Sequence, residues 1–138
     1  MDVQTSQVLA LLGSRDYNYP NYGYVNSADA FLQPGSSIKP FVYAALFKQR
    51  DGVNYGPGSV LSDEPLPQSI YTTTEGTSVQ NFDGKFRGAI PIRNSLPESR
   101  NIPAIKAMYI AGRELTLNTI HDMGDTSYCT NGVDKQVT

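Results

Sequence analysis

Apolar positions follow the most regular pattern between residues 36 and 49. Residues 41–47 (FVYAALF) carry no charge, and apolar residues recur here at the spacing of a helix face. The stripe consists of Ile38, Phe41, Val42, Ala45 and Leu46. The turn dipeptide Pro34-Gly35 precedes it, and Asp51-Gly52 follows. The sequence therefore predicts a helix from Ser36 to about Gln49 that is buried on nearly every face.

The parts of the chain around this helix give weaker patterns. Residues 8–12 (VLALL) predict a short buried strand closed by Gly13, and residues 24–30 predict a second short strand or edge segment. Residues 53–69 are interrupted by five Pro or Gly residues from Gly56 to Pro67 and predict an irregular surface excursion. Residues 70–90 predict loop with short extended pieces.

Helical signals return in the second half of the chain. Pro91 suits a first helical position and predicts a short helix over residues 92–96, which Pro97 ends or bends. A second helix is predicted from Ile102-Pro103 to Gly112. Its apolar face would consist of Ile102, Ile105, Met108 and Tyr109. Residues 114–123 predict a further helical segment, and the polar residues 124–138 predict turns without a closing element.

Composition narrows the possible functions. The 138 residues fit one domain, and with a net charge of −2 and no basic run, nucleic acid is not an expected partner. The longest apolar run is far shorter than the ~18 residues that span a membrane, and the N-terminus has no signal-peptide pattern. Cys129 is the single cysteine, which excludes an internal disulfide and a cysteine-based zinc site. We predict no cofactor and no metal.

Ser36 and Lys39 form the first candidate site. Residues three apart share a helix face, so a hydroxyl and an amine would lie side by side where a turn becomes a buried helix. A serine becomes a good nucleophile when an adjacent base takes its proton. Burial and the positive end of the helix dipole both disfavour the charged lysine, which favours such a base. The alternative is that Ser36 is a helix cap and Lys39 an ordinary surface lysine.

Ser99 and Asn101 form the second candidate pair, in a segment broken by Pro97 and Pro103. In a tight turn, positions i and i+2 can point the same way, toward the first pair. The hydroxyl could relay a proton, and the carboxamide could hold a peptide amide through one donor and one acceptor. The alternative is that both residues cap the helix that follows.

Together, S-x-x-K followed by S-x-N resembles the penicillin-binding protein transpeptidases and serine β-lactamases. The resemblance extends to the strand-like VLALLG, to a G-x-D-Y loop with one inserted residue (GSRDY, 13–17) and to residues 25–28 (VNSA). Residues 33–46 (QPGSSIKPFVYAAL) and 81–106 (NFDGKFRGAIPIRNSLPESRNIPAIK) resemble the class A, bifunctional members most. The similarity covers roughly residues 2–125.

The resemblance implies a role for each residue. Ser36 would be the acylated nucleophile, Lys39 its general base, Ser99 the proton-relay serine and Asn101 the residue that holds the substrate amide. The implied reaction is transpeptidation of peptidoglycan stem peptides that end in D-Ala-D-Ala, and β-lactams would acylate the same serine. The implied location is the outer face of the bacterial cell membrane, with the anchor and any glycosyltransferase domain upstream of this chain.

The resemblance also implies a fold and a boundary. The expected class is α+β, an antiparallel sheet packed with helices, with residues 1–138 as the N-terminal part of a transpeptidase domain. The family's K-T-G motif is absent, because Lys106 and Lys135 are followed by Ala and Gln. We therefore expect the C-terminal sheet strands to be missing and the chain alone to be inactive.

Five other interpretations stay open. The intact protein could be a hydrolase of the same fold, a DD-carboxypeptidase or β-lactamase, or a non-catalytic sensor that only acylates with β-lactams. Residues 114–118 (ELTLN) match the E-x-x-L-N deacylation loop of class A β-lactamases, although an exposed helical Glu114 also explains them. His121-Asp122 could complete a triad with a serine, or could be a solvated pair. The four tyrosines of residues 14–24 could stack on a sugar or serve packing and turns.

Overall fold

The computed structural model describes residues 1–30, 32–48, 52–67, 78–125, 129–130 and 133–134. By internal contacts the chain separates into two units, one formed mainly by Met1–Pro34 and one that begins at Gly35. The helices and the β1–β2 sheet all belong to the second unit. Helices and a small antiparallel sheet within one unit confirm the predicted α+β class.

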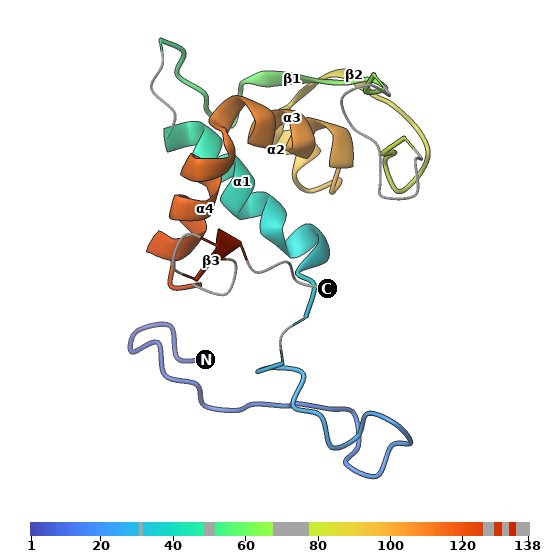
Figure 1. Ribbon diagram of the computed structural model, residues 1–138, viewed down its shortest axis with the longest axis vertical. Helices are drawn as coiled ribbons and strands as arrows, with labels where there is room; N and C mark the ends of the chain where they lie inside the picture. The colour runs from blue at the N-terminus through green and yellow to red at the C-terminus, as the bar shows by residue number, and fades with distance from the viewer. Residues whose placement is uncertain (31, 49–51, 68–77, 126–128, 131–132, 135–138) are drawn as a thin grey trace. The chain divides into compact units, whose positions relative to one another are not determined.

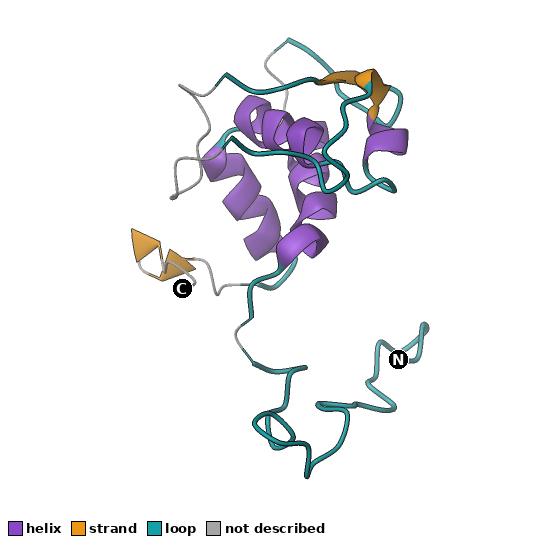
Figure 2. Cartoon of the chain, turned by 90° about the vertical axis from the view of Figure 1, so that its right-hand side faces the viewer, coloured by secondary structure: helices purple, strands orange, loops and turns teal. Residues whose placement is uncertain are grey.

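Both strands predicted in the first unit are wrong. Residues 8–12 are loop, and the side chains of Val8, Leu9 and Leu12 are 63%, 70% and 84% exposed. An extended segment becomes a strand only by pairing its backbone groups, and the described residues offer it no partner strand. Residues 24–30 turn instead, because the Asn26 carbonyl accepts from the N–H groups of Asp29 and Ala30. Figure 2 accordingly draws the described part of this unit as loop throughout.

The predicted helix is present, but it begins as a 3₁₀ turn. Gly35–Ile38 form the 3₁₀ helix η1, and the α-helix α1 spans Lys39–Lys48. Pro40 explains the boundary, since an α-helix reaching back to Ser36 would need a hydrogen bond from the N–H that Pro40 lacks. Gly35 enters the turn with a φ of 53°, which glycine adopts without a steric penalty. Gln49 lies outside the described residues.

Three further helices follow in the order that the sequence predicts. They are α2 (Ile92–Ser95), α3 (Asn101–Ala111) and α4 (Arg113–Asp122). Pro91 is not the first residue of α2 as predicted but the extended residue just before it. Gly112, with a φ of 81°, ends α3 and starts α4, so the predicted stop is confirmed.

The predicted apolar face of α3 is only partly right. Ile102 is buried, but Met108 and Tyr109 are 39% and 74% exposed. The buried positions further along α3 are Ala104 and Ala107. These small side chains face the core that α3 shares with α1, which leaves the larger residues on the opposite side.

The segment predicted to be irregular contains a strand. β1 (Val60–Asp63) pairs antiparallel with β2 (Gly88–Pro91), with Leu61 opposite Ile90. β1 forms because it pairs with a strand that follows after 24 intervening residues of the chain. The prolines and glycines on either side of β1 indicated an irregular segment, so the sequence pattern did not predict it. Near the C-terminus, β3 (Cys129–Thr130) and β4 (Val133–Asp134) form a two-residue antiparallel ladder where turns alone were predicted. Residues 68–77 lie outside the description.

The core lies where α1, α3, α2 and β1 meet. Its buried members are Val42, Tyr43, Leu46, Leu61, Ile92, Ala104 and Ala107. Helix α1 runs beside α3 and α4, and β1 lies against α3 (Figure 1). This arrangement brings the start of α1 close to the start of α3, which carry the two candidate pairs.

Candidate active site

The structure brings Ser36 and Lys39 together as predicted. In a 3₁₀ turn, side chains three residues apart eclipse one another. Lys39 Nζ accordingly lies 3.0 Å from Ser36 Oγ. Ser36 is exposed while Lys39 is only 7% exposed, so the hydroxyl can be reached from solvent and the amine is covered.

The second pair converges on the same amine. Lys39 Nζ lies 3.1 Å from Ser99 Oγ, 2.7 Å from the Ser99 carbonyl and 2.6 Å from Asn101 Oδ1. These contacts span 60 and 62 residues of sequence. All four candidate residues therefore belong to one cluster centred on Lys39 Nζ.

The four contacts limit what the amine can do. The carbonyl oxygens of Ser99 and Asn101 can only accept, so they take two of its N–H groups. The remaining position of the nitrogen faces the two hydroxyls, which can both donate and accept. A neutral amine can donate to the two carbonyls and direct its lone pair at the hydrogen of one of the two hydroxyls. The geometry suits a base that withdraws a proton from Ser36 or Ser99.

Burial of Lys39 shifts its protonation equilibrium toward the neutral form. Burial lowers the pKa of Lys39 below its ordinary value, because desolvation disfavours the ammonium. Its four hydrogen-bond partners are hydroxyl and carbonyl oxygens, and within the described residues no carboxylate forms an ion pair with it. A carboxylate neighbour would act in the opposite direction.

Ser99 reaches Lys39 through an unusual backbone conformation. Its φ is 51°, in the left-handed region that costs a residue with a Cβ roughly 1–2 kcal/mol. The Ser99 N–H donates to the carbonyl of Leu96 at 2.9 Å, which closes the turn after α2. This turn directs both the carbonyl and the hydroxyl of Ser99 toward the amine. Strain of this kind is found where the surrounding structure holds a functional geometry.

Asn101 is held at both ends of its carboxamide. Its Oδ1 accepts from Lys39, and its Nδ2 donates to the Gln80 carbonyl at 2.7 Å. Its backbone N–H donates to Asn81 Oδ1 at 2.8 Å, and the next N–H, of Ile102, donates to the same oxygen at 3.3 Å. The Asn81 side chain therefore caps the N-terminus of α3 from a distant segment. Neither Ser99 nor Asn101 caps the helix, contrary to the alternative considered from the sequence.

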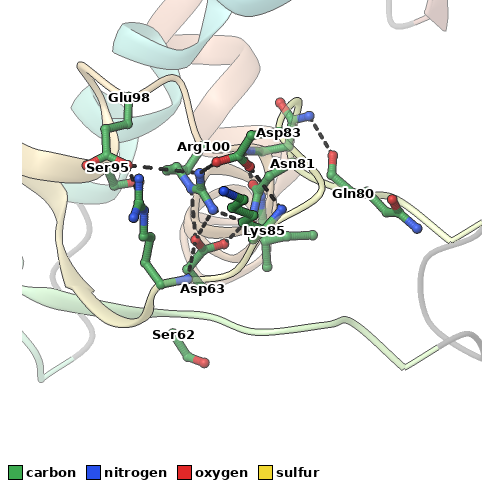
Figure 3. A network of polar contacts seen from close by, with 12 residues as sticks. Ser62, Asp63, Gln80, Asn81, Asp83, Lys85, Ser95, Glu98 and Arg100 are labelled. Carbon is green, nitrogen blue, oxygen red and sulfur yellow. Dashed lines mark hydrogen bonds and ion pairs between the residues drawn. The ribbon is translucent and has the colours of Figure 1, made fainter.

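Between Ser99 and Asn101, the side chain of Arg100 points the other way, into the protein. Arg100 is 3% exposed and Asp63 is fully buried. Arg100 Nε and Nη2 each lie 2.8 Å from Asp63 Oδ2, and Nη1 lies 2.9 Å from Asp83. Nη2 also donates to the carbonyl of Lys85. Figure 3 shows the guanidinium between the carboxylates of Asp63 and Asp83.

This polar network is the part of the site that sequence reasoning missed. Asn81 and Asp83 lie within the NFDGK segment that carried the resemblance, so position alone could have drawn attention to them. Asp63 gave no signal, because Ser62-Asp63-Glu64 followed by Pro65 has the composition of an exposed turn. Beside Ser99, the outer residues of the network line a cavity of about 420 Å³, with Phe82 exposed at its edge.

Other candidates do not join the cluster. Asp122 pairs with Lys48 at 2.9 Å, and among the described contacts His121 makes none with Ser36 or Ser99, so the proposed triad is not assembled. Glu114 is exposed in the first turn of α4. Within the described residues, no three His, Cys, Asp or Glu side chains gather as metal ligands, and none of the described helices could cross a membrane.

Comparisons with known proteins agree on one family, although no protein-family model matches the chain. The chain is 32% identical over 124 residues to penicillin-binding protein 1A of Rickettsia conorii and 29% identical over 125 residues to penicillin-binding protein 1A/1B of Bacillus subtilis. It is 29% identical over 133 residues to penicillin-binding protein 1C of Escherichia coli. These matches cover 90–96% of the chain but only 13–16% of the relatives.

A solved structure points the same way. The fold resembles a crystal structure of penicillin-binding protein 1A from Haemophilus influenzae, with a TM-score of 0.59 and 32% identity. The match covers 73% of this chain and 14% of that one. The resemblance found in the sequence is thereby confirmed: over most of its length the chain is similar to one part of penicillin-binding proteins.

Proposed function

We propose that the full-length protein is a serine-type D-Ala-D-Ala transpeptidase of peptidoglycan synthesis and that residues 1–138 are the N-terminal part of its transpeptidase domain. The observation that carries the proposal is the cluster of two hydroxyls and two carbonyls around a buried lysine amine. Relatives named penicillin-binding proteins support the same class of substrate and inhibitor. Its partners would be stem peptides and β-lactams, at the outer face of the membrane.

Acylation would begin at Ser36. The neutral amine of Lys39 accepts the hydroxyl proton as Oγ attacks the carbonyl carbon between the two D-alanines. The Ser99 hydroxyl, 3.1 Å from the amine, passes a proton onward to the leaving nitrogen. The C–N bond then breaks, D-Ala leaves as an amine, and the stem peptide remains as an ester on Ser36. An amine of a second stem peptide displaces Ser36 and completes the cross-link.

Asn101 would bind the substrate in addition to its two protein partners. The Lys39 ammonium or amine uses one lone pair of Oδ1, and the Gln80 carbonyl uses one hydrogen of Nδ2. A carboxamide has a second lone pair and a second hydrogen. These remaining groups suit a peptide amide of the substrate, so Asn101 would align the substrate relative to the base.

The test uses the full-length protein and a fluorescent penicillin, followed by peptide mapping of the label. We expect one acylated residue, Ser36, and loss of labelling in Ser36→Ala with Ser37→Ala as the matched control. A label on Ser37 or Ser99 would contradict the assignment. A cross-linking assay with lipid-linked substrate then separates the classes. Release of D-Ala without cross-links would indicate a hydrolase, and acylation without any turnover would indicate a sensor.

A further inference from the structure

We infer that Asp63 is a positioning residue for the Ser99–Asn101 segment, although it contacts none of the four candidate catalytic residues. The inference rests on the proposed function and extends it to a residue on a different strand. Asp63 ends β1, and its carboxylate is fully buried. It accepts hydrogen bonds from Arg100, Asn81 and the backbone of Arg87.

The first link runs through Arg100. Because Ser99 and Asn101 both turn toward Lys39, the residue between them must point away from it. Arg100 does so and inserts a charged side chain that is 3% exposed. The two contacts of 2.8 Å to one oxygen of Asp63 define where that side chain ends. Any shift of Asp63 would therefore displace the backbone on which Ser99 and Asn101 are mounted.

The second link runs through Asn81 and depends on the charge of Asp63. An ionised carboxylate can only accept, so Asn81 must direct Nδ2 toward Asp63 Oδ1, at 2.7 Å. That leaves Asn81 Oδ1 for the N–H groups of Asn101 and Ile102. An asparagine at position 63 could itself donate, which would allow the Asn81 amide to flip and face those N–H groups with its own donors.

Stability alone does not explain the buried pair. Desolvation cancels much of the attraction in a buried ion pair, and packed apolar residues often replace one at no cost. The same region contains the exposed pair Arg87–Glu98, at 3.3 Å, which needs no such burial. The buried Asp63 carboxylate accepts from four donors and so fixes the orientation of the groups that carry them. Two of these residues, Arg100 and Asn81, hold the segment that contacts Lys39.

The test compares Asp63→Asn with Asp122→Asn in the full-length protein. Both changes keep the size of the side chain, but Asp122 forms an exposed pair with Lys48. The assay separates penicillin binding (Kd) from the acylation rate constant. We expect Asp63→Asn to lower the acylation rate constant at least tenfold and to change Kd less than threefold, whereas Asp122→Asn changes neither.

A second comparison separates positioning from general damage. If Asp63 acts through Asn101, the loss of acylation rate caused by Asp63→Asn should shrink at least threefold in an Asn101→Ala background. Equal losses in both backgrounds, or an unchanged rate in Asp63→Asn, would overturn the inference. If Asp63→Asn does not fold, Asn81→Ser carries the test, because it leaves the ion pair intact and weakens the cap. A full acylation rate in Asn81→Ser would then overturn it. Failure of the unaltered protein to acylate at Ser36 would instead refute the proposed function.

Discussion

Replacing Ser99 by glycine and by alanine separates its backbone role from its hydroxyl. Ser99 has a φ of 51°, and its carbonyl and its hydroxyl both contact Lys39 Nζ. Both replacements remove the hydroxyl, but only glycine relieves the left-handed strain. The carbonyl contact at 2.7 Å can survive in either variant.

The expected stability difference follows from two opposing terms. Relief of strain favours the glycine variant by roughly 1–2 kcal/mol, and the larger chain entropy of unfolded glycine disfavours it by roughly 0.5–1 kcal/mol. Ser99→Gly should therefore be more stable than Ser99→Ala by about 0.5–1 kcal/mol. Since both lack the relay hydroxyl, both should acylate about 10²–10⁴ times more slowly than the unaltered protein.

Denaturant unfolding and penicillin acylation of the same preparations check both statements. Asn118, an exposed residue within α4, provides the control, because its backbone is helical. There the order should reverse, with the glycine variant less stable than the alanine variant by about 1 kcal/mol. An alanine variant at Ser99 that is as stable as the glycine variant would refute the strain argument. Normal acylation by either would refute the relay role.

Three further predictions concern the amine and its acceptors. Lys39→Arg should abolish acylation with little change in Tm, because a guanidinium stays protonated; acylation at the normal rate would mean that another base acts. The acylation rate should rise with pH with a midpoint below the ordinary lysine pKa of about 10.4, because burial lowers the pKa of Lys39. Stability should rise with pH in the same window, between the lowered and the ordinary pKa, because there the unfolded chain binds more protons; a flat profile in both assays would contradict a buried lysine. Asn101→Ala should reduce kcat/KM for a D-Ala-D-Ala peptide more than it reduces the denaturation midpoint, and a large stability loss with normal turnover would make Asn101 structural.

The sequence predicted those parts of the fold that depend on local periodicity and local stop signals. The helix after Ser36, the end of α2 just before Pro97 and the end of α3 at Gly112 are of this kind. The sequence pattern did not predict β1, because β1 is stabilised by pairing with the distant strand β2. Residues 8–12 have the composition of a buried strand, but they form loop in the structure because no described strand pairs with them. A strand is stabilised by hydrogen bonds to a neighbouring strand, and a local sequence pattern carries no information about that neighbour.

The candidate site also has one part that local spacing predicts and one part that depends on long-range contacts. The spacing of Ser36 and Lys39 is local, so the sequence could predict their contact, and the S-x-N spacing predicted that Ser99 and Asn101 could point the same way. Turn geometry led us to expect that the second pair could face the first, but not that both would meet at one nitrogen, at distances of 2.6–3.1 Å. The roles of the four residues stay predictions.

The buried polar residues behind the site could not be predicted from the sequence, for a physical reason. A charged residue is normally exposed, and burial reverses its meaning only when partners from other segments surround it. The local sequence indicates that Asp63 is exposed. In the structure it is buried by partners that include Arg100 and Asn81, which lie 37 and 18 residues away in the sequence. The same holds for Lys39, whose chemistry depends on burial and on neutral acceptors supplied from 60 residues away. Spacing can suggest a nucleophile and its base, but the burial that lowers the pKa of Lys39 is a property of the folded chain.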